Sequence, residues 1–389
     1  MPTKIIFGTG TEEEAGKEAA AYSDTVLLHY GGGSIRRSGL YDRVMDSLGR
    51  AGLEVYELGG VQPNPRLSLI REGIELCREK GIGLVLAVGG GSVIDSAKGI
   101  AAGVSYEGDV WELYQGKPVE KAIPVGTVLT IAAAGSETSD GSVVTKEDEN
   151  LKRFINSVHI VPKFSILNPE LTRTLSEEQT MTGIADIFAH LLERYFTQTE
   201  NVDFSDHLLE GALRSLVKNA VELRKNLKNY DLRTEIMWAG SMAHNNILGV
   251  GREQDWASHL IEHELSGFYD VAHGAGLAVV FPGWMEYVYK ENVTRFAQYA
   301  YRVWDVELDF IDLTPAALGG IQKTREFFQA IGMPSSLREL NIPNDRLEDM
   351  AANCVLDGPV GNFKKLNKDD VLAILQSVAD TGLTTSSSD

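Results

Sequence analysis

Short β-rich runs alternate with helical patterns from residue 4 to residue 167, and this alternation limits the possible folds more than any other feature of the sequence. Amphipathic segments such as 41–51 and 65–80 lie between the runs. Parallel strands need such crossover segments, and strands buried on both faces are largely apolar. The sequence therefore predicts an α/β domain with a mainly parallel, Rossmann-like sheet. The expected strands are 4–7, 25–30, 53–58, 82–88, 123–129 and 164–167.

Two of the expected strands run directly into glycine-rich turns. The sequence Gly-Gly-Gly-Ser follows the strand 25–30, at 31–34, and occurs again after the strand 82–88, at 89–92. A strand, a glycine turn and a helix start bring backbone N–H groups onto a phosphate. A single turn of this kind is equally well explained as a tight connection, but two at the carboxyl ends of strands favour a dinucleotide. Neither turn has the G-x-G-x-x-G pattern, so a standard Rossmann assignment does not follow.

A third candidate for cofactor contact is the segment 130–139, which follows the strand ending near residue 129. The segment consists mainly of small residues and includes the hydroxyl side chains of Thr130, Ser136 and Thr138. Its composition fits a loop that lines a cofactor and an ordinary loop equally well.

The hydrophobic pattern changes near residue 172. Ser176 and Gln179 have the spacing of a capping box at the start of a helix. From there on, apolar residues recur at helical spacing and alternation is rare. We therefore expect two domains, an α/β dinucleotide-binding domain at 1–172 and an all-helical, metal-binding domain at 173–389.

Histidines are scarce, and their spacing in the second half is typical of a metal site. Three of the eight histidines lie between residues 254 and 274. His259 and His263 are four residues apart, as are Asp186 and His190, so each pair shares one helix face. His273 precedes a glycine where a helix is expected to end. A lone helical histidine is more often a hydrogen-bonded core residue, but two pairs and His273 favour a divalent metal, Fe(II) or Zn(II).

Composition and charge exclude several classes of protein. A formal net charge of −19 argues against nucleic acid and anionic membranes as partners, because both need a basic surface. No apolar run reaches the length of a membrane span, and the N-terminus lacks the features of a signal peptide. Two cysteines, Cys77 and Cys354, cannot form a disulfide framework. We expect a cytoplasmic enzyme whose metal site has no thiolate ligand.

Several motifs in the same order resemble the iron-containing (group III) alcohol dehydrogenases, and within them the butanol dehydrogenase-like, NADPH-dependent aldehyde reductases. The resemblance runs from about Ile5 to about residue 350. The matching segments are 30–35, 64–65, 87–95, 135–137, 186–190 and 254–265, with His273 downstream. The fold implied is that of dehydroquinate synthase-like and iron-dependent alcohol dehydrogenases, and the family is typically dimeric.

The resemblance also implies residue roles, position by position. Asp186, His190, His259 and His273 match the family's metal ligands, and His263 matches a histidine proposed to transfer a proton near the nicotinamide. A family threonine is replaced by Ala134, which removes one cofactor contact. The residues expected to bind the cofactor are Gly32, Gly33, Ser34, Arg36, Gly89, Gly90, Gly91, Ser92, Asp95, Thr130, Ser136, Thr138 and Lys152.

One detail bears on the choice of cofactor. NAD-using relatives often carry an acidic residue after the second strand, where it pairs with a ribose 2′-hydroxyl and repels a 2′-phosphate. In this sequence the corresponding turn, 31–34, is uncharged, and Arg36 and Arg37 follow closely. Guanidinium groups suit a 2′-phosphate. The sequence therefore favours NADP(H) over NAD(H).

The expected reaction is reversible hydride transfer between the nicotinamide and the carbonyl carbon of a small aliphatic aldehyde, with the metal as Lewis acid. The nucleotide would then face the metal across the two domains. Polyol dehydrogenases and dehydroquinate synthase-like lyases share this plan and are alternatives. A remote alternative is a zinc peptidase, because residues 259–263 spell H-x-x-E-H, with Glu262 as general base.

Overall fold

The computed structural model describes residues 2–379, which form two compact units. The first unit runs to Thr180 and also takes Asn226–Ile247, and the second comprises Met181–Lys225 and the chain from Leu248 on. The segment Asn226–Ile247 therefore belongs to the first unit although it lies beyond residue 172. The boundary expected from the sequence remains a prediction.

The first unit contains a six-stranded, fully parallel sheet with the strand order β1-β8-β5-β4-β2-β3. This confirms the predicted fold class. The strands are β1 (Lys4–Phe7), β2 (Thr25–Tyr30), β3 (Glu54–Leu58), β4 (Leu84–Gly89), β5 (Val125–Leu129) and β8 (Phe164–Leu167). A separate antiparallel hairpin, which the sequence pattern did not predict, consists of β6 (Gly141–Lys146) and β7 (Leu151–Asn156).

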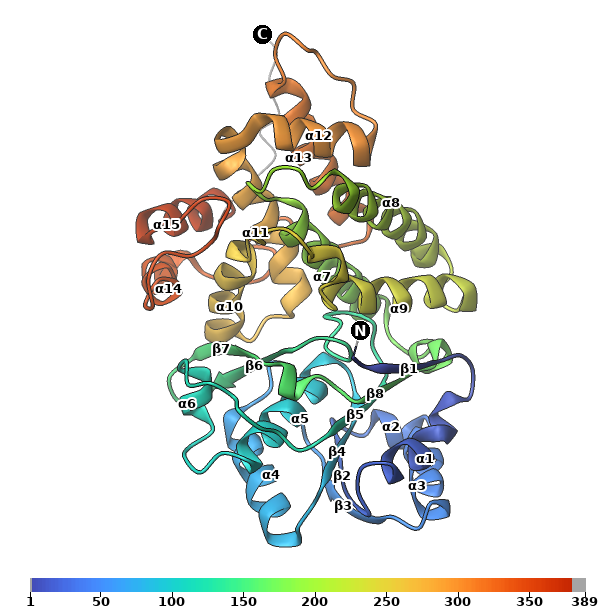
Figure 1. The fold of residues 1–389 in the computed structure, drawn as a ribbon. Helices are drawn as coiled ribbons and strands as arrows, with labels where there is room; N and C mark the ends of the chain where they lie inside the picture. The colour runs from blue at the N-terminus through green and yellow to red at the C-terminus, as the bar shows by residue number, and fades with distance from the viewer. Residues whose placement is uncertain (1, 380–389) are drawn as a thin grey trace. The chain divides into compact units, whose positions relative to one another are not determined.

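Helices cover both faces of this sheet, as a parallel sheet requires (Figure 1). The helices of this unit are α1 (Ala15–Ala20), α2 (Ser34–Arg37), α3 (Leu40–Arg50), α4 (Leu67–Lys80), α5 (Gly91–Val104), α6 (Trp111–Tyr114) and α9 (Tyr230–His244). Successive strand residues point to opposite faces. Leu27 accordingly belongs to the core beneath α4 and α5, while Val26 and Leu28 belong to the core beneath α1 and α3.

The second unit is helical, as predicted, and its described residues form no strand beyond the isolated bridge of Val360 with Leu366. The first helix starts after Ser176, whose hydroxyl accepts the N–H of Gln179 at 3.1 Å while the Gln179 side chain accepts the N–H of Ser176 at 3.3 Å. This reciprocal pair confirms the expected capping box. The helices are α7 (Glu177–Tyr195), α8 (Asp203–Lys225), α10 (Ala257–Tyr269), α11 (His273–Val288), α12 (Val293–Trp304), α13 (Thr314–Ala330), α14 (Leu347–Cys354) and α15 (Lys368–Ser377).

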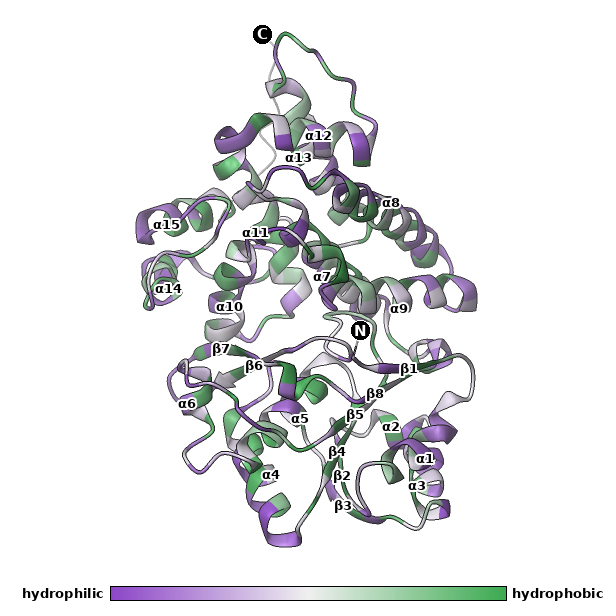
Figure 2. Ribbon diagram, viewed as in Figure 1, coloured by the Kyte–Doolittle hydropathy of each residue, from purple (hydrophilic) through white to green (hydrophobic). Residues whose placement is uncertain are grey.

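Hydropathy follows burial in both units. The central strands are drawn largely in the hydrophobic colour, whereas α8 shows hydrophobic and hydrophilic stripes (Figure 2). The two faces of α8 reflect its half-exposed position.

None of the helices in the described range is long and apolar enough to cross a membrane. Short 3₁₀ segments complete the structure: Thr11–Glu14, Val158–Ile160, Pro169–Thr172, Ile247–Gly249, Tyr289–Asn292 and Asn344–Arg346.

Candidate metal centre and cofactor turns

Helix α7 carries the first part of the candidate metal centre. Asp186, His190 and Glu193 follow one another at intervals of four and three residues, so they share one face of the helix. All three are buried. Helical spacing therefore delivers a carboxylate, an imidazole and a second carboxylate to the same region of the second unit.

Helices α10 and α11 bring the remaining histidines to this face. His259 lies in the first turn of α10, and His273 is the first residue of α11. A helix therefore begins at His273, where the sequence led us to expect a helix end. Close packing depends on Gly274, where a Cβ atom would stand 2.0 Å from the backbone oxygen of Thr182 on α7. Only glycine fits at such a contact. The start of α11 therefore reaches α7 closely enough for His273 to meet Asp186.

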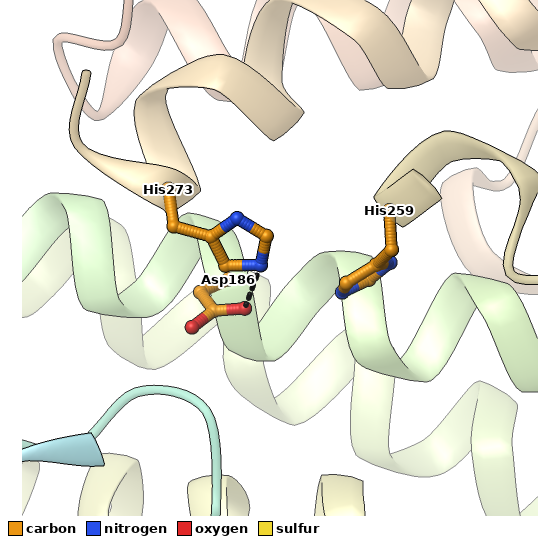
Figure 3. A group of neighbouring side chains, drawn as sticks. All are labelled: Asp186, His259 and His273. Carbon is orange, nitrogen blue, oxygen red and sulfur yellow. Dashed lines mark ion pairs between the residues drawn. The ribbon is translucent and has the colours of Figure 1, made fainter. Parts of the chain in front are cut away.

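The four predicted metal ligands lie together in the structure. Asp186 Oδ1 is 3.2 Å from His190 Nε2 and 3.9 Å from His273 Nε2. One ligand atom each from Asp186, His259 and His273 lies within 4.8 Å of the others. Figure 3 shows the His273 ring beside the Asp186 carboxylate, with His259 approaching from the neighbouring helix. The ring centroids of His190 and His259 are 4.5 Å apart, with the two rings tilted by 39°.

The protonation of these histidines suits a metal. Burial lowers the pKa of His259 to about 3 and holds the pKa of His190 well below its ordinary value of 6.5. Both imidazoles are therefore neutral near pH 7 and offer a lone pair. The Nε2 atom of His259 is buried and has no hydrogen-bond partner among the described residues. An orphaned lone pair beside a buried carboxylate fits a divalent cation.

Two buried glutamates hold these imidazoles, and the sequence pattern did not assign them this role. Glu193 Oε1 accepts a hydrogen bond from His259 Nδ1 at 2.7 Å. Glu262 Oε2 accepts one from His273 Nδ1, and Glu262 Oε1 accepts the Ser266 hydroxyl. A carboxylate on Nδ1 directs Nε2 toward a metal. The available signal for Glu193 was its place seven residues after Asp186 on one helix.

Trp256 packs against the metal centre in an unusual backbone conformation. Its φ angle is 70°, in the left-handed region that non-glycine residues rarely adopt. Its ring lies 5.5 Å from that of His190 and 5.0 Å from that of His259, between centroids. The Arg194 guanidinium stands over the indole at 4.9 Å. The Trp256 ring therefore forms one wall beside two predicted ligands.

His263 lies next to this group and belongs to a second one, with Glu262 and His273, whose ligand atoms lie within 4.8 Å of one another. Its ring is 5.7 Å from that of His273. The role of His263 in proton transfer remains a prediction. The peptidase hypothesis requires Glu262 as a free general base, whereas its carboxylate holds His273 and Ser266.

The second glycine turn lies in the first unit, at the end of β4. Gly90 precedes α5, which begins at Gly91, and a Cβ atom at Gly89 would stand 2.4 Å from Val93 Cγ2. The turn thus leads directly into a 14-residue helix, as the phosphate hypothesis expects. Ser92 occupies the first turn of that helix. The proposed phosphate contacts of this turn remain predictions.

A buried network joins several of the predicted cofactor residues. Asp95 accepts the Ser136 hydroxyl and the backbone N–H of Val143, the latter at 3.1 Å. Ser136 also accepts from Lys98 Nζ at 3.0 Å. Burial raises the pKa of Asp95 and lowers that of Lys98 to about 8. The sequence pattern did not single out Lys98, because a lysine inside a helix gives no sign of being fully buried.

The other predicted cofactor residues of the segment 130–152 make internal contacts. The Thr138 hydroxyl donates to the backbone oxygen of Ser241 on α9 at 3.0 Å. The Thr130 N–H donates to the Gly89 oxygen at 3.0 Å, which sets this residue beside the second glycine turn. Lys152 Nζ donates to Asn64 Oδ1 at 3.0 Å. Their cofactor contacts remain predictions.

The first glycine turn is open to solvent. Gly32, Gly33 and Ser34 are exposed, and a Cβ atom at Gly32 would meet no atom within 4 Å. Arg36 donates to Glu57 Oε2 and to the Tyr30 hydroxyl, each at 2.8 Å. Its charge is therefore already balanced by a carboxylate.

Comparisons with known proteins agree with this organisation. Residues 2–169 match the family model described as iron-containing alcohol dehydrogenase, and residues 179–379 match the C-terminal model of the Fe-containing alcohol dehydrogenase family. A probable NADH-dependent butanol dehydrogenase of Bacillus subtilis is 47% identical over 97% of both chains. An NADPH-dependent aldehyde reductase of Escherichia coli is 37% identical over 88% of both chains. The crystal structure of an NADH-dependent butanol dehydrogenase from Thermotoga maritima superposes with a TM-score of 0.94, at 39% identity and 97% coverage of both chains.

These matches span both units and confirm the resemblance read from the motifs. They favour a dehydrogenase over the lyase and peptidase alternatives. The chain belongs to the iron-containing alcohol dehydrogenase family and is an NAD(P)-dependent oxidoreductase of the alcohol dehydrogenase and aldehyde reductase type.

Proposed function

We propose that this protein reduces small aliphatic aldehydes to alcohols, with NADPH as the preferred hydride donor and a metal ion, Fe(II) rather than Zn(II), held by Asp186, His190, His259 and His273. The observation that carries the proposal is the buried donor set around Asp186, in which His259 Nε2 lacks a hydrogen-bond partner among the described residues. When bound, the metal supplies Lewis acidity at the carbonyl oxygen of the substrate.

The side chains of this chain supply the surroundings that the reaction needs. One carboxylate and neutral imidazoles leave a divalent cation with a net positive charge, which stabilises negative charge on the substrate oxygen. The packed wall of Trp256 and the buried face of α7 exclude water from His190 and His259. We assign His263 as the group that passes a proton between solvent and the developing alcohol, a task suited to an imidazole.

The aldehyde preference rests on relatives named for butanol dehydrogenase and aldehyde reductase activity. The decisive assay follows NADPH oxidation by absorbance with butanal as substrate, using metal-stripped protein reloaded with Fe(II) or Zn(II). We expect turnover only after metal is restored. Failure to reduce any aldehyde or to oxidise any alcohol, with either nucleotide and either metal, would refute the proposal.

The preference for NADPH rests on the first glycine turn. The turn carries no carboxylate, and the Arg37 guanidinium lies beside it, with Nη1 3.0 Å from the position of a Cβ atom on Gly33. Arg37 is exposed and forms no ion pair with any residue from 2 to 379. A free guanidinium at an uncharged turn is available to a 2′-phosphate. Relatives named for either cofactor are found among the matches, so only a measurement on this protein decides.

Replacing Arg37 with alanine is expected to lower kcat/KM for NADPH about tenfold and to leave kcat/KM for NADH nearly unchanged. The loss corresponds to one charge-assisted hydrogen bond, about 1.4 kcal/mol. Arg36→Ala is the matched control, since Arg36 is paired with Glu57, and it should have the smaller effect on NADPH. A larger NADPH-specific loss in Arg36→Ala would transfer the phosphate contact to Arg36, and wild-type preference for NADH would contradict the NADPH assignment itself.

We further propose that the enzyme is a cytoplasmic homodimer that acts on small molecules and uses neither nucleic acid nor a membrane as a partner. The dimer is expected from the family, and the acidic composition supports the absence of polyanionic partners. Light scattering of the purified protein tests the dimer directly.

A further inference from the structure

The Glu193 side chain accepts hydrogen bonds from two residues of the candidate metal centre, His259 and Trp256. Its carboxylate is fully buried. Oε1 accepts the backbone N–H of His259 at 3.1 Å and His259 Nδ1 at 2.7 Å, while Oε2 accepts the backbone N–H of Trp256 at 2.7 Å. Three nitrogen donors therefore converge on one side chain, two on the first oxygen and one on the second.

These contacts determine which nitrogen of His259 carries the proton. A histidine that binds a metal through one ring nitrogen bears its hydrogen on the other. Burial raises the pKa of Glu193 to about 8, but backbone N–H groups donate to both of its oxygens and favour the anion. We therefore assign Glu193 as the carboxylate and Nδ1 of His259 as the protonated nitrogen. The lone pair then lies on Nε2, the atom without a hydrogen-bond partner among the described residues.

We propose that Glu193 is a positioning residue that keeps His259 in its metal-binding tautomer and fixes the Trp256 backbone beside it. This inference rests on the proposed metal site and adds a residue that the ligand set does not contain. Glu193 acts only through His259 and Trp256 and touches no substrate or cofactor in this role. Carboxylates of this kind change metal affinity about 10- to 100-fold when they are replaced.

Replacing Glu193 with glutamine turns one of its two hydrogen-bond acceptors into a donor. If the amide oxygen faces His259, the amide NH₂ faces the Trp256 N–H, and two donors oppose each other. If the amide is flipped, its NH₂ group faces His259 Nδ1 and forces the proton onto Nε2, which removes the lone pair. Neither orientation satisfies all three donors, so Glu193→Gln must disturb the site.

Glu262 provides the matched comparison. It holds His273 Nδ1 with one oxygen, and its other oxygen accepts the Ser266 hydroxyl. A hydroxyl can accept as well as donate. In Glu262→Gln the amide oxygen can keep His273 while the NH₂ group donates to Ser266, which redirects its proton to the Val271 oxygen 3.3 Å away. The same substitution should therefore disturb the site less at Glu262 than at Glu193.

The test measures the affinity of metal-stripped protein for Co(II), by competition with a chromogenic chelator. We expect Glu193→Gln to raise the dissociation constant about 10- to 100-fold and Glu262→Gln to raise it by a smaller factor. In a His259→Ala background, Glu193→Gln should change the constant by less than about threefold, because its effect passes through the missing imidazole. Equal losses in both backgrounds, or equal losses in the two glutamine variants, would overturn the positioning role.

A second measurement does not depend on the variant folding. Nitrogen chemical shifts of the histidine rings in metal-free wild-type protein should show His259 protonated on Nδ1, and the opposite tautomer would contradict the inference. A different result would refute the proposed metal site itself: wild-type protein that does not bind Co(II), or Asp186→Ala protein that binds it as well as wild type. If Asp186→Ala weakens Co(II) binding but Glu193→Gln does not, the metal site stands and only the positioning role of Glu193 is refuted.

Discussion

Replacing Asp186 with alanine is expected to remove metal-dependent aldehyde reduction almost completely. Asp186 is the only anionic side chain among the four proposed ligands, and its Oδ1 lies within 4 Å of the Nε2 atoms of two of the histidines. The remaining imidazoles are neutral, so the cation would lose both a ligand and its charge partner. If the Lewis-acid contribution of about 4 kcal/mol is lost, kcat falls roughly a thousandfold. The measurement is NADPH oxidation with butanal after reloading with Fe(II), together with the bound metal content.

The chain supplies a matched control for this variant. Asp203 and His207 on α8 have the same four-residue spacing, and their side chains are paired at 3.6 Å, but they are 72% and 61% exposed. An exposed pair contributes little. Asp203→Ala should therefore retain wild-type activity and metal content. Comparable activity losses in Asp186→Ala and Asp203→Ala would count against the metal centre and in favour of a general defect of the helical unit.

Helical spacing was sufficient to predict that Asp186 and His190 lie together, whereas the full set of four ligands came from the family resemblance. The relation of Asp186 to His190 follows directly from the period of one helix, because residues four apart share a face. The meeting of α7, α10 and α11 does not follow from periodicity. It depends on close contacts such as the one at Gly274, which a sequence shows only as a small residue.

The supporting carboxylates were harder to predict than the ligands. Glu193 and Glu262 are charged residues on helices, and such residues are usually exposed. Both are buried, because hydrogen bonds to histidines and to backbone N–H groups offset the loss of hydration. Glu262 was noticed only through the H-x-x-E-H pattern, which led to the peptidase alternative. Sequence spacing cannot distinguish a general base from a carboxylate that already has partners.

In the α/β unit, too, the elements with a regular apolar pattern were predicted, and the contacts between distant residues were not. Apolar runs predicted all six strands of the parallel sheet, since burial on both faces leaves a continuous pattern. The hairpin of β6 and β7 was missed because its strands show no strict alternation of apolar and polar residues. The pairing of Arg36 with Glu57, 21 positions away, was also not predicted, and the cofactor contact expected of Arg36 remains a prediction. Such long-range pairs have no periodic signature.

Gly274→Ala is expected to destabilise the helical unit and weaken metal binding together. A Cβ atom at this position would stand 2.0 Å from the Thr182 oxygen and 3.0 Å from its carbonyl carbon, both in the backbone of α7. Backbone atoms cannot rotate away as a side chain does, so α11 must shift from α7 and carry His273 with it. Overpacking of this kind costs about 3 kcal/mol or more. Thermal unfolding and the Co(II) dissociation constant measure the two effects.

The matched control for this change is Gly211→Ala on α8. A Cβ atom there meets nothing within 4 Å, and alanine inside a helix is favoured over glycine by about 0.5–1 kcal/mol. We therefore expect Gly211→Ala to unfold at the same temperature as wild type or slightly higher, with unchanged Co(II) affinity. If Gly274→Ala instead matched Gly211→Ala in both measurements, α11 would not need its close contact with α7. The position of His273 beside Asp186 would then have to be maintained by the Glu262 hydrogen bond alone.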